Sequence, residues 1–75
     1  MNELLELLES IKPGVDFKNS ENMVEEGLID SFDMINIVAN INMNFNIDFP
    51  VTEIIPENFK TVETLYAAIE RVKNS

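Results

Sequence analysis

Apolar residues recur at helical spacing in three stretches of this chain, and the first stretch is residues 2–11. Its apolar positions are Leu4, Leu7, Leu8 and Ile11. Spacings of three and four residues are typical of an amphipathic helix with one buried stripe. Pro13 and Gly14 follow this stretch and are expected to end the helix.

The second and longest periodic stretch predicts a helix from about Ser31 to Phe45. Asp30 is a favourable N-cap for this helix, and Asp33 lies in its first turn, where negative charge is stabilised. In helical projection one face is predicted to be buried: Met34, Val38, Ile41 and Phe45, flanked by Ile35 and Ile37.

Two further groups of residues on the same helix bear on function. A polar stripe is predicted opposite the buried face: Asp33, Asn36, Asn40 and Asn44. A third, apolar group lies well off the centre of the core face: Phe32, Ala39 and Met43. Such a group can be a docking surface for a partner protein, or it can pack on neighbouring helices. The sequence leaves both interpretations open.

The third periodic stretch predicts a last helix, capped by Thr61 and carrying Arg71 and Lys73 at its negative end. Its inner positions are Val62, Leu65, Ile69 and Val72, with Tyr66 at the margin. Residues 51–59 can hold at most a turn or two of helix, because Pro56 interrupts them.

No segment has a convincing strand pattern, so the predicted fold class is all-α. We expect a small bundle of three main helices plus one short helix, in a single domain over residues 1–75. Residues 15–30 form a long connection with scattered apolar residues, and we expect it to pack across the bundle. The predicted core is Leu8, Ile11, Phe17, Leu28, Val38, Ile41, Phe45, Phe59, Leu65 and Ile69. If Phe45 is fully buried, its replacement by alanine should cost about 3–5 kcal/mol.

Charge narrows the choice of partners. Fourteen acidic residues against five basic residues give a formal net charge of −9. A field of this sign disfavours nucleic-acid binding and favours partners with basic docking patches, although it could equally serve only solubility. No apolar run approaches the roughly 20 residues of a membrane span, and cysteine is absent. We therefore expect a cytoplasmic monomer that does not insert into membranes.

Covalent chemistry has one candidate residue, Ser31. Without histidine or cysteine, a serine hydrolase lacks its base and a zinc site lacks its usual ligands. The acidic residues also lack the spacing of a calcium-binding loop, so we predict no metal site and no catalytic activity. Ser31 can still be the target of another enzyme, because a hydroxyl in the first turn of a helix lies beside unpaired amides. The alternative is that Ser31 is simply a tolerated first-turn residue.

The residues around Ser31 belong to a wider motif. Residues 23–32 read Met-Val-Glu-Glu-Gly-Leu-Ile-Asp-Ser-Phe. This stretch resembles the attachment-site region of the acyl carrier protein and peptidyl carrier family. Residues 45–50, Phe-Asn-Ile-Asp-Phe-Pro, resemble the family's exit from its second helix, and residues 61–65 resemble the start of its last helix. The resemblance covers essentially the whole chain.

This resemblance implies a cofactor and a set of partners. A phosphopantetheinyl transferase (holo-synthase) would attach 4′-phosphopantetheine from coenzyme A to Ser31. The thiol of that group would carry an acyl or aminoacyl group as a thioester, loaded by a ligase and passed to a downstream acyltransferase or synthase. The residues expected to dock these enzymes are Asp30, Phe32, Asp33, Ala39 and Met43.

The chain departs from the carriers of fatty-acid synthesis, which have a strongly acidic second helix. Here the polar stripe carries asparagines, so docking through this helix would lose much of its charge steering. Residues 27–31 and 48–53 are more similar to D-alanyl carrier proteins, which take D-alanine toward teichoic acids. A carrier for another amino acid or a specialised acyl pathway is equally compatible.

A rival hypothesis is an acidic helical interaction module that binds basic partners and is never modified. The substitution Ser31→Ala separates the two, because it should abolish the function of a carrier and spare a binding module.

Overall fold

Three α-helices make up most of the structure, a computed structural model that describes residues 2–74. Their bounds are α1 Asn2–Ile11, α2 Ser31–Phe45 and α3 Val62–Lys73. Two short 3₁₀ turns, η1 (Val51–Glu53) and η2 (Pro56–Phe59), lie between α2 and α3. Residues 2–74 contain no strand, so the predicted all-α bundle is confirmed.

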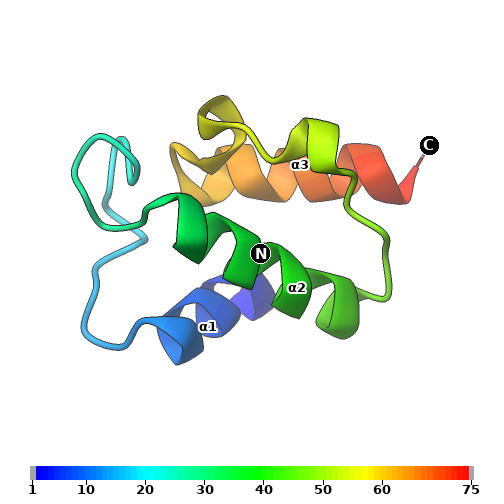
Figure 1. The fold of residues 1–75 in the computed structure, drawn as a ribbon. Coiled ribbons are helices and arrows are strands. Elements are labelled where there is room, and N and C mark those ends of the chain that lie inside the picture. Colours follow the sequence, from blue (N-terminus) through cyan, green and yellow to red (C-terminus); the bar gives the residue numbers. More distant parts are fainter. Residues whose placement is uncertain (1, 75) are drawn as a thin grey trace.

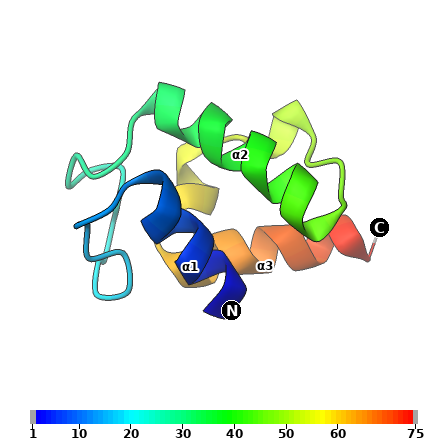
Figure 2. The same cartoon turned by 90° about the horizontal axis from the view of Figure 1, so that it is seen from below.

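The helices are arranged around one core. Helix α1 packs against both α2 and α3, and η2 packs against α3. In Figures 1 and 2, α2 and α3 run in the same general direction and α1 runs back against them. The buried apolar side chains are Leu4, Leu8, Phe17, Met23, Ile29, Met34, Ile37, Val38, Ile41, Phe49, Phe59, Val62, Leu65, Ala68 and Ile69. At the centre, the rings of Phe49 and Phe59 meet edge to face with centroids 6.5 Å apart.

Side-chain caps determine where α2 and α3 begin. The Asp30 carboxylate accepts the amide of Asp33 at 2.9 Å, and the Asp33 carboxylate accepts the amide of Asp30 at 3.1 Å. This reciprocal capping box satisfies two amides that a helix start leaves without partners. Thr61 and Thr64 form the same arrangement at α3. Both predicted N-caps are therefore confirmed.

The faces of α2 differ from the prediction in two respects. Ile37 is buried whereas Ile35 is 61% exposed, so the two predicted flanks of the core face are not equivalent. Phe45 is only half-buried, because it lies in the last turn of α2, where the helix passes the edge of the core. Phe45 was predicted to lie mostly inside, and the structure leaves it less buried than the other residues of that face. Ile11 and Leu28, also predicted inside, are likewise half-buried at the margin of the core.

The polar stripe of α2 also lies elsewhere than predicted. It occupies a flank of the helix, beside α1, and Asp33 and Asn40 are partly covered there. A surface hollow lined by α1 residues and by Asn44 marks the same flank. The side of α2 opposite the core instead carries apolar residues, and Asn36 and Asn44 stay exposed on the flank beside α1.

The long connection between α1 and α2 packs down onto the protein, as predicted. It lies at the end of the bundle where α2 and α3 begin (Figure 1). Three of its apolar side chains are buried: Phe17, Met23 and Ile29. The amide of Met23 donates to the carbonyl of Lys60 at 2.6 Å, which ties the connection to the start of α3.

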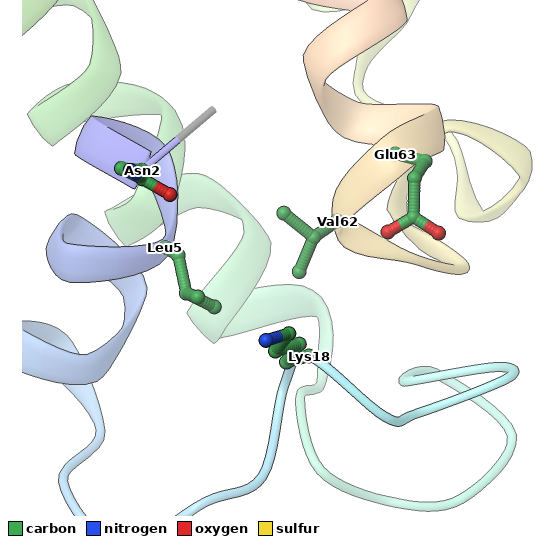
Figure 3. A pocket seen from close by; sticks show the side chains of 5 residues that line it. All are labelled: Asn2, Leu5, Lys18, Val62 and Glu63. Atoms are coloured by element: carbon green, nitrogen blue, oxygen red, sulfur yellow. The ribbon is translucent and has the colours of Figure 1, made fainter.

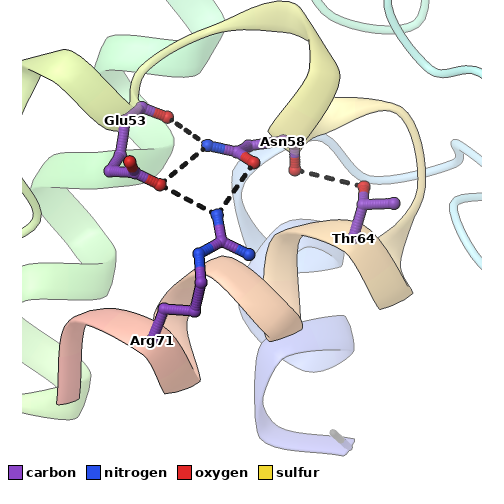
Figure 4. A network of polar contacts seen from close by, with 4 residues as sticks. All are labelled: Glu53, Asn58, Thr64 and Arg71. Carbon is purple, nitrogen blue, oxygen red and sulfur yellow. Dashed lines mark hydrogen bonds and ion pairs between the residues drawn. The ribbon is translucent and has the colours of Figure 1, made fainter. Parts of the chain in front are cut away.

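A polar network attaches the two 3₁₀ turns to α3 (Figure 4). Arg71 donates to the Glu53 carboxylate at 2.9 Å and to the side-chain oxygen of Asn58 at 3.2 Å. The buried Asn58 amide donates to the backbone carbonyl of Glu53 at 2.8 Å. The Arg71 guanidinium lowers the pKa of the Glu53 carboxyl. Arg71 was predicted only as a charge at the end of the helix, and the structure gives it this bridging role as well.

Candidate functional site at the start of helix α2

Ser31 is the first residue of α2, and it is exposed to solvent. The capping box uses the amides of Asp30 and Asp33, and the amide of Met34 donates to the carbonyl of Asp30. Within residues 2–74, the amides of Ser31 and Phe32 have no hydrogen-bond partner. Unpaired amides at a helix start attract anions, so this turn offers donors for a phosphate group beside the Ser31 hydroxyl.

The turn that leads into Ser31 is anchored from inside the protein. The carbonyl of the buried Met23 accepts the amides of Leu28 and Ile29 at 3.0 and 3.3 Å. The bend between these points passes through Gly27, whose φ of +75° lies in the left-handed region that favours glycine. With Ile29 held in the core, the chain emerges at Asp30 and presents Ser31 outward.

Lys12 holds the same turn from the side of α1. Its ammonium group donates to the carbonyl of Leu28 at 2.7 Å and to the Asp33 carboxylate at 3.0 Å. One contact precedes Ser31 in the chain and the other follows it. Sequence reasoning missed Lys12, because its partners lie 16 and 21 residues further along and no local pattern connects them. The one local signal for a role of Lys12 was its position beside Pro13, directly after a helix.

Asp33 is committed to this turn rather than free at the surface. Its side chain is 18% exposed and forms an ion pair with Lys12. The hydrogen bond from Lys12 is the main reason that the pKa of Asp33 lies below its usual value, with burial acting in the opposite direction. Asp30 is exposed and also caps the helix. The expected docking role of these two acids stays a prediction.

The outer face of α2, which we define as Phe32, Ile35, Ala39 and Met43, is apolar and exposed. Phe32 is 77% exposed and Met43 is 76% exposed. Packing on neighbouring helices, one of the two interpretations left open, is thereby excluded for these residues. On the adjoining flank, the amides of Asn40 and Asn44 donate to the carbonyls of Asn36 and Asn40, each at 2.8 Å. Because asparagine side chains carry no charge, this flank is uncharged beyond the first turn.

One pocket between the elements lies apart from this chemistry. A pocket of about 90 Å³ opens between α1, the long connection and the start of α3 (Figure 3). Its lining residues are Asn2, Leu5, Lys18, Val62 and Glu63, and Ser31 is not among them. Across residues 2–74, no group of acidic side chains is arranged to hold a metal ion. None of the helices in residues 2–74 has the length and hydropathy of a membrane span.

Comparison with known proteins shows which family this chain belongs to. A family model described as "Phosphopantetheine attachment site" matches residues 2–69. The chain belongs to this family. The chain is also 37% identical, over 59 residues, to "Aminoacyl carrier protein 1" of Bradyrhizobium diazoefficiens. That match covers 79% of this chain and 64% of the relative, so the chain spans less than two thirds of the relative's length. No solved structure gives a significant match.

Membership of this family of carrier proteins supplies the cofactor, covalently attached 4′-phosphopantetheine. The residues at the start of α2 fit this group. An exposed hydroxyl can form the phosphodiester, and the amides of Ser31 and Phe32 can donate to its oxygens. When bound, the group supplies a thiol, which this chain of 75 residues without cysteine lacks.

Proposed function

We propose that Ser31 is the attachment serine and that the chain delivers an acyl or aminoacyl group bound to the phosphopantetheine thiol. The observation that carries the proposal is the position of Ser31, an exposed hydroxyl at a capped helix start with two unpaired amides. The other serines of residues 2–74 lack this setting. Ser10 lies inside α1, and Ser20 donates its hydroxyl to Glu26 in the long connection.

The attachment step is carried out by a separate phosphopantetheinyl transferase, with coenzyme A as donor. The Ser31 oxygen forms a bond to the phosphorus nearest the pantetheine, and the pyrophosphate bond of coenzyme A breaks. Adenosine 3′,5′-bisphosphate leaves, and the hydroxyl proton passes to a base of the transferase. The chain itself catalyses no step. It raises the effective concentration of the tethered cargo at each partner enzyme, and we place this delivery in the cytoplasm.

The cargo in this proposal is an amino acid held as a thioester. The similarity to a protein named an aminoacyl carrier supports this choice. D-Alanine is the first candidate, because residues 27–31 and 48–53 resemble those of D-alanyl carriers. An aminoacyl ligase would load the thiol, and a downstream acyltransferase or synthase would take the cargo.

The outer face of α2 is the docking surface in this proposal, with Phe32, Ala39 and Met43 as its contacts and Ile35 added by the structure. A partner protein that contacts Ser31 can also bury the exposed apolar side chains of the helix face beside it. Asp30 adds a negative charge at the edge of this docking surface. Asp33 contributes indirectly, through the turn that it stabilises.

Intact-mass measurement tests the attachment. The purified chain is incubated with coenzyme A, magnesium and a broad-specificity phosphopantetheinyl transferase, beside Ser31→Ala and the control Ser10→Ala. We expect the parent and Ser10→Ala to gain one phosphopantetheine group and Ser31→Ala to gain none. No gain by a parent chain shown to be folded would instead favour an unmodified interaction module.

Loading assays then test the cargo. The modified chain is offered activated D-alanine, other amino acids and acyl groups with candidate ligases, and the thioester is detected by mass and by cleavage with hydroxylamine. Aminoacyl loading is expected. Loading by acyl groups alone would contradict the aminoacyl proposal and leave the attachment intact.

A further inference from the structure

The ammonium group of Lys12 contacts the two sides of the turn that carries Ser31. It donates to the carbonyl of Leu28 before the serine and to the carboxylate of Asp33 after it. Lys12 itself directly follows the last residue of α1. The side chain therefore links the end of one helix to the first turn of another, with the attachment serine between its two contacts.

We propose that Lys12 is the positioning residue for modification of Ser31: it fixes the first turn of α2 against α1, so that the hydroxyl meets the transferase at one angle. This inference rests on the proposed function of Ser31. Transfer of a phosphoryl group requires the attacking oxygen in line with the leaving group, so a small displacement of the turn is costly.

The contacts of Asp33 explain how one lysine can have this effect. The same carboxylate oxygen of Asp33 accepts both the Asp30 amide that completes the capping box and the Lys12 ammonium. Lys12 therefore orients the side chain that completes the capping box. It also compensates a negative charge in the turn where the phosphate of coenzyme A arrives, and that charge would otherwise repel the donor.

A purely structural role is the competing interpretation, and the chain contains a control for it. Arg71 also links distant segments, through Glu53 and Asn58, and α3 carries it toward the end of the bundle away from the long connection (Figures 1 and 4). Arg71→Met should destabilise the bundle without touching the Ser31 turn. Lys18→Met is the control for charge, because Lys18 is exposed in the long connection and has no ion pair within residues 2–74.

The experiment measures steady-state phosphopantetheinylation of the full chain, with the thermal midpoint of every variant recorded beside kcat and KM. Lys12→Met should lower kcat by about 10-fold to 100-fold with a smaller change in KM, because the hydroxyl is misplaced while the outer face of α2 stays intact. Lys12→Arg should restore most of kcat, since a guanidinium can reach both acceptors. Arg71→Met and Lys18→Met should keep the parent's kcat.

The outcomes separate the two proposals. If the parent is modified and Lys12→Met matches it, or loses only as much rate as Arg71→Met, the positioning role is wrong and the attachment at Ser31 stands. Failure of Lys12→Arg to recover the rate would also overturn the positioning role. If the parent gains no phosphopantetheine at Ser31, the proposed function fails and this inference falls with it. Should Lys12→Met not fold, Lys12→Gln keeps an uncharged NH2 group as donor on a shorter side chain and should give an intermediate kcat.

Discussion

At the scale of single residues, one carboxylate oxygen of Asp33 is shared between two contacts. It accepts the Asp30 amide that closes the first turn of α2, and it accepts the Lys12 ammonium that ties this turn to α1. Both contacts are stronger to the ionised carboxylate than to the neutral acid. Protonation of Asp33 therefore weakens the helix cap and the link between helices together, at the turn that presents Ser31.

The pH dependence of stability should reveal this coupling. Lys12 holds the pKa of Asp33 below its value in the unfolded chain. A lowered folded pKa means that the stabilisation is fully present above the unfolded pKa of about 3.9 and is lost as the pH falls through the folded pKa. We expect the parent to exceed Asp33→Asn in unfolding free energy by about 1 kcal/mol at neutral pH, and this difference to shrink in acid.

Urea unfolding of both chains across the acidic range is the measurement. Glu9→Gln is the matched control, because Glu9 is exposed on α1 and has no ion pair within residues 2–74. A parent–variant difference for Asp33→Asn that does not change with pH would show that the Lys12 pair contributes nothing through its charge.

At the scale of elements, α2 has three distinct sides with different neighbours. One side forms the core, the asparagine flank lies beside α1, and the outer face is open to solvent. Both ends of helix α2 are fixed by caps. Asp30 closes the first turn, and Asn46 ends the helix in a left-handed conformation with φ of 55°.

Phe45, in the last turn of α2, and Phe59, in η2, should differ in their energetic contribution. Phe59 is fully buried, so Phe59→Ala should cost about 3–5 kcal/mol, by lost transfer energy and an unfilled cavity. Phe45 is half-buried, and Phe45→Ala should cost about half as much. Chemical denaturation of both variants measures this order. Equal losses would mean that the core extends to the last turn of α2.

At the scale of the whole molecule, charge and apolar surface are separated. The formal net charge is −9, yet the outer face of α2 carries no acidic residue. The charge acts at long range and is screened by salt, whereas apolar contact acts at short range and is not. Partners should therefore be attracted by the molecule as a whole and recognised by the outer face.

Substitution of Met43 should distinguish these contributions. Because Met43 is 76% exposed and can be covered by a partner, Met43→Ser should raise the KM for the phosphopantetheinyl transferase by about tenfold, or about 1.4 kcal/mol. The effect should persist at high salt, while the KM of the parent rises with salt. The matched control is Val51→Ser, an equally exposed apolar residue on η1. An equal effect of Val51→Ser would contradict the assignment of docking to α2.

Local signals in the sequence determined the helix bounds and the candidate serine. Caps such as Asp30 and Thr61 bond to amides within the same turn, and Pro13 and Gly14 end the periodic stretch that they follow. The exposure of Ser31 does not follow from its place in the first turn alone, because Val62 at the same position of α3 is buried. Helical spacing then gave the buried stripe, because it fixes the direction of each side chain relative to its own helix.

Only the tertiary structure determined which neighbouring element packs against each side of a helix. It placed α1 against the asparagine flank, left Ile35 exposed beside a buried Ile37, and left Phe45 at the edge of the core. It also brought Lys12 to Leu28 and Asp33, which are 16 and 21 residues away in the chain. Periodicity describes a helix about its own axis, and contacts between helices depend on how those axes pack.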